Sequence, residues 1–474
     1  MSKQPPQRTR RDALKTMGLL GGAGAIGLAG VPAAGNDSIQ EPPAKPSGFY
    51  AELKALVDQT PLVDSHEHLP DEAERLHGSK RWTQMFQQYF GSDFIAAGLE
   101  DGSVFGGNDD PLVPWERIKP YWNAVKNTGY GQEYRIAIHE LYGIEELNES
   151  TIPKLQEAYE KTITKGFYRR LLQEHAGIES CQVDRGPYSE TRQPGLLLQD
   201  INIVAMQSVR EVQGISGRVG TTVNDLSDWH ETIRLFFKKY APFATAVKSQ
   251  IAYERGIDFE RVSPEAAEEP CKKRLENQEL SANEQKRLQD HLFWFCVQQA
   301  NEHSLPVKLH TGYYAGANYM PIERVSKNPA QAAELCRMSP ETRWMFMHTC
   351  YPYGREMIAI AKHFTNAHLQ SCWAWIIDPV GTKNFLKQYI VAAPANKIHV
   401  FGGDHWTVEN VVGHARIARN GVFASLYELV DEGYLSQKDA LELVEPLLRG
   451  NARRIFQLEK KYEMAKNVPW NTEE

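Results

Sequence analysis

Eight short apolar segments recur along this 474-residue sequence, and helical stretches separate most of them. The helical stretches include Leu226–Tyr240, Asn283–Glu302 and Tyr353–Phe364. Strands that alternate with helices predict a parallel sheet. Eight is the number of strands that closes a (β/α)8 TIM barrel, which is the α/β fold we predict. The strand candidates are Leu62–His66, Ile178–Val183, Ile201–Ala205, Phe243–Lys248, Pro306–His310, Trp344–His348, His368–Cys372 and Ile398–Phe401.

The barrel is expected to occupy residues 61–460, with residues 461–474 as a tail. After the first strand, residues 70–175 read as a long helical insertion rich in Trp, Tyr and charge, and Thr151–Leu172 has helical apolar spacing. An open doubly wound sheet is the alternative. No Gly-x-Gly-x-x-Gly follows a strand and opens a helix, so the sequence gives a dinucleotide-binding fold no support.

Composition excludes several classes of protein. The net charge is −7 and no basic stripe stands out, so nucleic acid is not expected as a partner. The six cysteines are scattered without a Cys-x-x-Cys pair, which favours buried free thiols over a disulfide framework. Downstream of the N-terminus, no apolar run is long enough to cross a bilayer.

Polar side chains follow the predicted strands where each strand ends. In a TIM barrel the carboxyl ends of the strands converge on one mouth. Each of these residues alone has an ordinary explanation, such as a hydrogen-bonded core histidine or a helix cap, but their joint order is hard to obtain by chance. Five are common metal ligands, and a lysine becomes one if carbamylated. The residues are His66, His68, Lys248, His310, His348 and Asp404.

The histidines of the first strand form a His-x-His pair. Side chains alternate along a strand, so His66 and His68 point the same way and can share one metal ion. The order of these residues resembles the amidohydrolase superfamily, in particular the amidohydrolase-related family that includes domains fused to glutamine-synthetase-like proteins. The long insertion also resembles this family and the uronate isomerases. The motifs that carry the resemblance are Val63–His68, Val247–Tyr253, Lys308–Gly312, His348–Glu356, Phe401–Asp404 and Gly450–Arg454.

The resemblance implies that His66, His68, His310 and Asp404 hold a divalent metal, which we expect to be zinc. Zinc lowers the pKa of bound water to about 7. Asp404 would pass the proton of the attacking water to the leaving group, and His348 would hydrogen-bond the water or the substrate oxygen. A carbamylated Lys248 would bridge two metal ions, whereas an unmodified lysine would be a cation in the mouth; both alternatives stay open.

Further residues are candidates for substrate binding. Arg355 follows the sixth strand by one helical turn and could pair with a carboxylate. Arg255 corresponds to an arginine of the family, although the preceding Glu254 departs from the family pattern. Aromatic rings near strand ends could line a pocket or pack the barrel rim, and the insertion would cover the mouth. These aromatic candidates include Tyr313, Tyr351, Trp373 and His405.

The leading interpretation is a metal-dependent hydrolase that cleaves a carbon–nitrogen bond, such as an amide, of a small polar substrate. The alternative enzyme keeps the metal but acts as a decarboxylase or a uronate-isomerase-like enzyme. A metal-binding protein without turnover is disfavoured, because three histidines and a carboxylate leave a position open for water. A homo-oligomer is compatible with the sequence.

The N-terminal segment predicts export. Arg10-Arg11 precede an uncharged Gly/Ala/Leu-rich stretch from Thr16 to Val31, so residues 1–35 resemble a twin-arginine signal peptide and predict a periplasmic protein. An uncleaved anchor helix is disfavoured by the four glycines between Gly18 and Gly24, so no stable membrane insertion is expected after processing. Residues 36–60 read as a linker and lead-in to the barrel.

Overall fold

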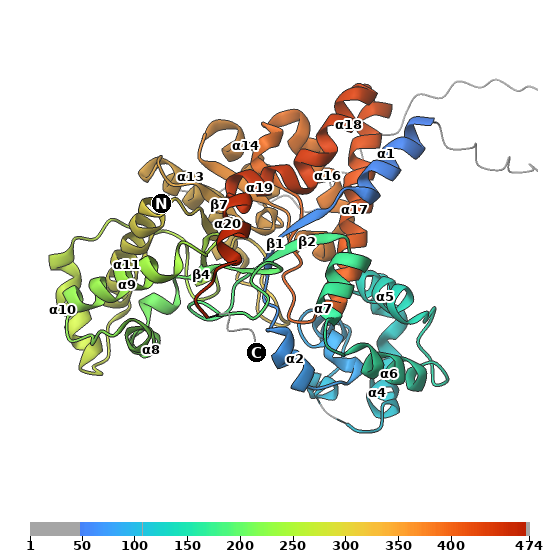
Figure 1. Ribbon diagram of the computed structural model, residues 1–474, viewed down its shortest axis with the longest axis horizontal. Helices are drawn as coiled ribbons and strands as arrows, with labels where there is room; N and C mark the ends of the chain where they lie inside the picture. Colours follow the sequence, from blue (N-terminus) through green and yellow to red (C-terminus); the bar gives the residue numbers. More distant parts are fainter. Residues whose placement is uncertain (1–47, 107, 471–474) are drawn as a thin grey trace, which may run out of the picture. The chain divides into compact units, whose positions relative to one another are not determined.

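The computed structural model of the protein describes residues 48–106 and 108–470 (Figure 1). The predicted signal peptide (1–35) lies outside these residues, as do residues 36–47 of the predicted linker. Residues 48–59 of that linker instead form helix α1 (Gly48–Gln59), because Phe49, Leu53 and Val57 recur at helical spacing and are buried. The lead-in is therefore part of the folded domain.

The strands form a parallel barrel of eight positions. β1, β2 and β3 pair in order, as do β4 to β9, and every pair is parallel. Asp200 alone separates β3 from β4, so these two share one barrel position. The strands are β1 (Leu62–Glu67), β2 (Ile178–Val183), β3 (Leu197–Gln199), β4 (Ile201–Asn202), β5 (Val247–Ser249), β6 (Val307–Leu309), β7 (Trp344–Phe346), β8 (Ala367–Gln370) and β9 (Ile398–His399).

Backbone hydrogen bonds connect the first strand with the segment that follows the last. The amide of Ser65 donates to the carbonyl of Phe401 at 3.2 Å, and the amide of Asp404 donates to the carbonyl of His66 at 2.9 Å. β1 and the end of the β9 segment are therefore neighbours, as a TIM barrel requires. The predicted fold class is confirmed.

Most predicted strands differ from the observed ones by one or two residues at an end, and two differ by more. The third was predicted over Ile201–Ala205, but it begins at Leu197 and ends at Asn202, whose Oδ1 accepts the amides of Val204 and Ala205 at 3.0 and 3.3 Å and turns the chain. The fourth was predicted from Phe243, but residues 243–246 form a turn before β5 begins at Val247.

Helices follow the strands and surround the barrel (Figure 1). The predicted helix Leu226–Tyr240 is confirmed as α9, which Asp225 caps through the amide of Asp228, and a capping box of Ser281 and Glu284 opens α11. The helices are α8 (Val209–Val219), α9 (Leu226–Tyr240), α10 (Pro264–Leu275), α11 (Ala282–Glu302), α12 (Ile322–Ser326), α13 (Asn328–Met338), α14 (Gly354–His363), α15 (Ala374–Ile377), α16 (Pro379–Ala392), α17 (Val408–Asp431), α18 (Gln437–Glu445), α19 (Asn451–Ile455) and α20 (Leu458–Ala465).

The segment between β1 and β2 is the predicted helical insertion. Stacked and tilted rings of Phe86, Phe90, Phe105 and Tyr134 fill its interior. The helical pattern over Thr151–Leu172 is interrupted between α6 and α7, where Gly166 adopts φ +84°. Its helices are α2 (Glu72–His77), α3 (Phe90–Ala96), α4 (Leu112–Val125), α5 (Gly129–Tyr142), α6 (Ile152–Thr162) and α7 (Phe167–Arg169).

Helix α5 of the insertion packs directly against α17 of the barrel. A side chain at Gly413 of α17 would collide with the backbone carbonyl of Glu133 in α5. Glycine at this position therefore permits the close approach of the two helices, which positions the insertion over the carboxyl ends of the strands.

Apolar residues close the opposite end of the barrel. Val63, Leu198 and Met345 of the strands pack with Ile455 and Phe456 near α19. Within the described residues, no helix has both the length and the apolar character needed to cross a membrane. All six cysteines are buried with free thiols.

Candidate metal centre

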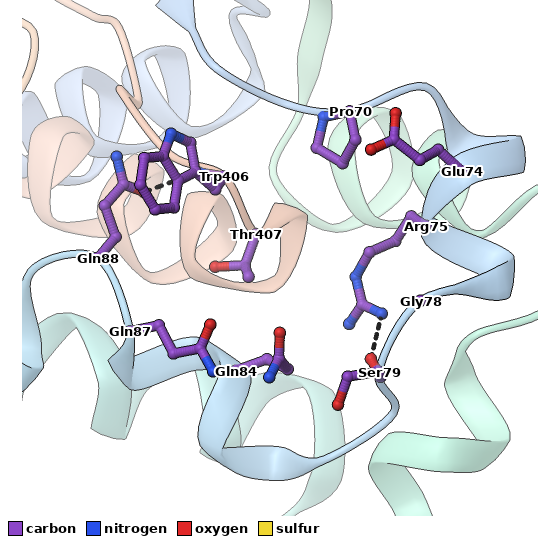
Figure 2. Close-up of a pocket in the computed structure, with 10 residues that line it drawn as sticks. All are labelled: Pro70, Glu74, Arg75, Gly78, Ser79, Gln84, Gln87, Gln88, Trp406 and Thr407. Atoms are coloured by element: carbon purple, nitrogen blue, oxygen red, sulfur yellow. Dashed lines mark hydrogen bonds between the residues drawn. The ribbon is translucent and has the colours of Figure 1, made fainter. Parts of the chain in front are cut away.

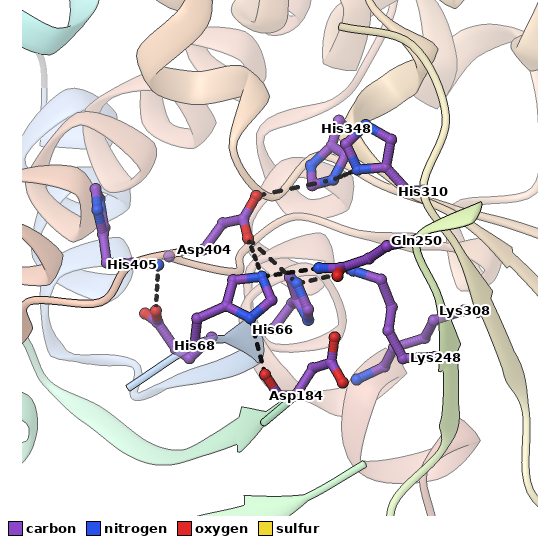
Figure 3. Close-up of polar contacts among 12 residues, drawn as sticks. His66, His68, Asp184, Lys248, Gln250, Lys308, His310, His348, Asp404 and His405 are labelled. Carbon is purple, nitrogen blue, oxygen red and sulfur yellow. Dashed lines mark hydrogen bonds and ion pairs between the residues drawn. The ribbon is translucent and has the colours of Figure 1, made fainter. Parts of the chain in front are cut away.

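The end of β1 and the loop after β9 bring three donor atoms together. His66 lies in β1 and His68 directly follows the strand, two residues further on, and the Nε2 atom of each lies 3.2 Å from Oδ1 of Asp404. Figure 3 shows Asp404 between this histidine pair and His348, whose Nε2 is 3.8 Å from Oδ2 of Asp404. Histidines at the ends of β1 and β7 therefore meet at the carboxylate that follows β9.

Backbone carbonyls fix the tautomers of two rings. His68 Nδ1 lies 2.8 Å from the carbonyl oxygen of Asp184, and His310 Nε2 lies 2.9 Å from that of Tyr313. A ring nitrogen must donate to a carbonyl, so His68 Nδ1 and His310 Nε2 carry protons, and Nδ1 of the neutral His310 ring keeps its lone pair. His310 joins the group through His348, because its Nδ1 is 3.1 Å from His348 Nε2.

Burial keeps the histidine rings neutral. It lowers the pKa of His66 and His348 well below the ordinary value, and it lowers that of His310 to about 3. The positive charge of Lys248 lowers these pKa values further. Neutral imidazole is the form that binds a metal ion.

Asp404 has the opposite behaviour. Burial alone would raise the pKa of its carboxyl, but the charge and hydrogen bond of His66 and the hydrogen bond of His68 lower it well below the ordinary value. Burial also acts to lower the pKa of His68, yet its contacts with Asp404 raise it overall. The site therefore holds a carboxylate that stays ionised beside histidine nitrogens.

Lys248 projects from β5 into this group. It is fully buried, and its Nζ is 2.9 Å from His66 Nε2. Gln250 lies two residues further on, and its Nε2 is 3.1 Å from His68 Nε2. The unmodified lysine thus contacts a predicted metal ligand through its amino group.

The donor set fits a divalent metal ion. Donor atoms of His66, His68 and Asp404 all lie within 4.8 Å of one another, and so do those of His348, Cys372 and Asp404. Neutral imidazoles, an ionised carboxylate and a sulfur atom are the donors that zinc prefers. Asp404 belongs to both groups, so the same carboxylate could serve one ion or two.

A third group with suitable donors is better described as a hydrogen-bonded chain. Glu133 of α5 lies 2.5 Å from His405 Nε2, and His414 Nδ1 lies 3.1 Å from the carbonyl oxygen of Gly403. His405 was predicted to bind substrate, but it is buried and its Nε2 is occupied by Glu133. His405 thereby links the insertion to the loop that carries Asp404.

The two predicted substrate arginines are not brought to the metal ligands. Arg255 Nη1 pairs with buried Asp290 of α11 at 2.7 Å, and its guanidinium lies over the ring of Phe259. Its charge therefore ties the loop after β5 to α11, which agrees with the departure from the family pattern at Glu254. Arg355 is exposed and lines a separate cavity of about 250 Å³.

The predicted aromatic residues form a chain of ring contacts that leads away from His348. Trp373 is buried and its ring is 5.6 Å from that of His348 and 5.5 Å from that of Tyr313. The ring of Tyr351 is 5.8 Å from that of Tyr313 and lines the same cavity as Arg355. The half-buried Tyr313 and Tyr351 continue this aromatic wall away from the metal ligands.

Two cavities open beside the ligands and share Pro70, Glu74 and Trp406 in their walls. The larger, about 480 Å³, reaches His68 and is otherwise lined by Asp184, Arg185, Gly186, Asn202 and Gln250. The smaller, about 210 Å³, lies between the insertion and the loop after β9, and Figure 2 shows its polar walls. A small polar molecule fits the larger cavity, with His68 at its wall.

Several residues at the site were missed by sequence reasoning. Asp184 directly follows β2, and Gln250 lies two residues after Lys248, so the rule that selected the other strand ends could have found both. Gln88 and Tyr89 lie in the insertion and contact the backbone of Asp404. No spacing in the sequence signals those two.

Comparison with known sequences finds a family match in the second half of the chain. Residues 249–458 match the sequence profile described as amidohydrolase. Over 231 residues the chain is 22% identical to protein fluG of Emericella nidulans, a match that covers 46% of this chain and 26% of that protein. The chain therefore aligns with only about a quarter of the curated relative that it matches.

Comparison with solved structures supports the fold over most of the chain. A uronate isomerase from Thermotoga maritima shares 15% identity at a TM-score of 0.71, covering 86% of this chain and 97% of that one. A glucuronate isomerase from Caulobacter crescentus shares 16% identity at 0.71, covering 87% and 94%. A candidate metal-dependent hydrolase from Lactobacillus casei shares 16% identity at 0.61, covering 86% and 98%. These likenesses concern the fold.

Proposed function

We propose that the chain is a metal-dependent hydrolase of the amidohydrolase superfamily that cleaves a carbon–nitrogen bond in a small polar substrate; the support in sequence is the match of residues 249–458 to the amidohydrolase profile. The observation that carries the proposal is the convergence of His66 and His68 on one ionised carboxylate, Asp404. His66, His68 and Asp404 would hold the first ion, which we propose to be zinc, and His310 and His348 would face a second.

A divalent ion at this position would polarise a substrate carbonyl and lower the pKa of bound water to about 7. Asp404 would accept the proton of the attacking water, because its carboxylate stays ionised and its Oδ2 faces His348. The same carboxylate would then return the proton to the leaving nitrogen. Neutral His348 would donate a hydrogen bond to the developing oxyanion.

The cavity of about 480 Å³ supports a polar substrate. Asn202 and Gln250 offer amide groups, Arg185 offers a guanidinium, and His68 connects this wall to the ligands. Arg185 is already paired with Glu74 through two hydrogen bonds of 2.8 Å, so a substrate would meet a paired charge and not a free cation. Neutral or zwitterionic polar substrates fit these walls better than a polyanion.

A uronate-isomerase-like reaction is the second candidate, and the fold likeness at a TM-score of 0.71 favours it. Both reactions use a metal and a proton-transfer group, so substrate turnover must separate them. The test is metal analysis of the purified protein, followed by assays of amine release from small amides and of aldose–ketose interconversion of hexuronates. Amine release that disappears with a chelator and returns with zinc supports the hydrolase; ketose formation alone would replace it with the isomerase.

We also propose that residues 1–35 direct twin-arginine export to the periplasm. The support is the Arg10-Arg11 pair ahead of the uncharged stretch to Val31. The test is a fusion of residues 1–35 to a reporter that is active only after folded export. Changing both arginines to lysine should stop export, and continued export of that variant would contradict the proposal.

A further inference from the structure

The loop that carries Asp404 is held by the helical insertion. The carbonyl oxygen of Asp404 accepts two hydrogen bonds, from Gln88 Nε2 at 2.7 Å and from Tyr89 Oη at 2.6 Å. Gln88 Oε1 accepts the amide of Trp406 at 2.7 Å, a contact drawn in Figure 2. One glutamine side chain thus bridges the residue that carries the carboxylate and the residue two positions later.

A second part of the insertion holds the residue between them. Glu133 of α5 lies 2.5 Å from Nε2 of His405, and the amide of His405 donates to Glu67 of β1 at 2.6 Å. Residues 404, 405 and 406 are therefore each bound to the insertion. We refer to Gln88, Tyr89 and Glu133 as the insertion clamp.

The backbone of Asp404 needs such support. Asp404 has φ +62°, the left-handed region, which a residue other than glycine adopts at a cost and which persists when the surroundings fix it. Its amide is held from the barrel side by the carbonyl of His66 at 2.9 Å, and its carbonyl is held from the insertion side by the clamp. Both neighbouring peptide planes are fixed, so the direction of the Cα–Cβ bond, from which the carboxylate reaches the histidines, is fixed as well.

We propose that the insertion clamp is a positioning device for the metal-binding carboxylate, in addition to any role of the insertion in covering the mouth. Gln88 and Tyr89 act through the backbone of Asp404 and are positioning residues. The proposal rests on the proposed function, because it is the metal site whose geometry the clamp sets. It extends that site to side chains that lie more than three hundred residues from Asp404 in sequence.

The test compares Tyr89→Phe with Tyr134→Phe. Tyr89→Phe removes the hydroxyl but keeps the ring that stacks on Trp373 at 4.5 Å. Tyr134 is a matched control, because its ring is buried in the same insertion and its hydroxyl has no hydrogen-bond partner among the described residues. Metal affinity is measured by competition of Zn²⁺ with a chelator, and the ligand field by the absorption of the Co²⁺-loaded protein.

We expect Tyr89→Phe to weaken metal binding by about tenfold, the effect of one hydrogen bond, and Gln88→Leu with Tyr89→Phe to weaken it by about a hundredfold. The Co²⁺ spectrum should change in both, while Tyr134→Phe keeps the wild-type affinity and spectrum. Turnover should fall in kcat more than it rises in KM, because neither Gln88 nor Tyr89 lines the larger cavity proposed for the substrate.

Two outcomes would contradict the positioning role of the insertion clamp. If Tyr89→Phe and the double variant, folded by circular dichroism, bind metal with wild-type affinity and spectrum, the carboxylate does not depend on the insertion. If Tyr134→Phe weakens binding equally, the effect is one of general packing. A wild-type protein that binds neither ion would instead sink the proposed function, so the two failures are distinguishable.

Discussion

Two histidine groups of this barrel contrast in their surroundings, and of these two only one suits a cation. At the carboxyl ends of the strands, His66, His68 and His348 surround an ionised carboxylate. Near the start of β8 and β9, His368 and His399 lie with ring centroids 5.7 Å apart. Both sets contain buried, neutral rings, so burial of histidine does not distinguish a metal site.

The charges around each set make the difference. After burial, the groups that lower the pKa of His368 are Lys397, Arg454 and Arg343. His399 is buried, and neither of its ring nitrogens has a hydrogen-bond partner within residues 48–106 and 108–470. Surrounding positive charges would repel a metal ion, whereas Asp404 attracts one. The comparison teaches that the counter-charge, and not the histidine count, defines the metal site.

The largest effect is expected from removing a ligand. His66→Ala should lower metal affinity by at least ~100-fold and abolish turnover, because it deletes a nitrogen beside Asp404. Metal content by mass spectrometry and folding by circular dichroism measure this. His399→Ala is the matched change in the other set and should leave metal content unaltered; full metal in His66→Ala would break the distinction between the two sets.

Removing the negative charge of Asp404 should weaken metal binding less than removing His66 does. Asp404→Asn keeps the shape of the side chain but loses the charge and the proton acceptor, so we expect turnover to fall by about 10² to 10⁴. Metal content should fall while the histidines remain. An Asp404→Asn protein with wild-type kcat would show that the carboxylate is not what separates the two sets.

An intermediate effect is expected at Lys248, whose Nζ contacts His66 Nε2. Lys248→Ala should lower turnover by about tenfold or more, since either a bridging carbamate or a cation is lost. The metal stoichiometry of the variant and the intact mass of the wild-type protein report which one is present. Unchanged stoichiometry together with unchanged kcat would contradict both roles.

The smallest effect is expected in the other set, and it appears in stability. The pKa of His368 is lowered to about 3 in the folded protein, so between about 6.5 and 3 the unfolded chain binds a proton that the folded chain does not. Stability therefore falls as the pH falls through this range. In His368→Leu the slope should decrease by up to ~1.4 kcal/mol per pH unit, measured by urea unfolding, with no change in metal content.

The strand positions and the polar strand ends were predictable because both are local signals. Short β-branched and aromatic runs mark β1, β6 and β7, and the residues that follow each run carry the chemistry. The start of β3 was missed because Leu197–Gln199 is separated from the stronger apolar signal at Ile201 by the charged Asp200. Asp200 is buried there and pairs with Lys308 at 2.6 Å, a partner that only the folded barrel supplies.

The roles of Arg255 and of the insertion could not be predicted for a similar reason. Arg255 pairs with Asp290 of α11, a choice that depends on how the helices pack. Gln88 and Tyr89 lie in the turn before α3 and Glu133 lies in α5, and their role arises only where the insertion contacts the loop after β9. Sequence periodicity specifies which face of a helix is apolar, but it does not specify what the polar face will meet.

The near-contact between Gly413 of α17 and Glu133 of α5 has a consequence for engineering. A chimera that places this insertion on a different barrel would need a glycine at the equivalent position of the recipient helix. A larger residue there would push α5 away from that helix. With α5 displaced, Glu133 would no longer reach His405, and the hydrogen bond between the insertion and the residue next to Asp404 would be lost. The first criterion for a recipient barrel is therefore a glycine at the position equivalent to Gly413.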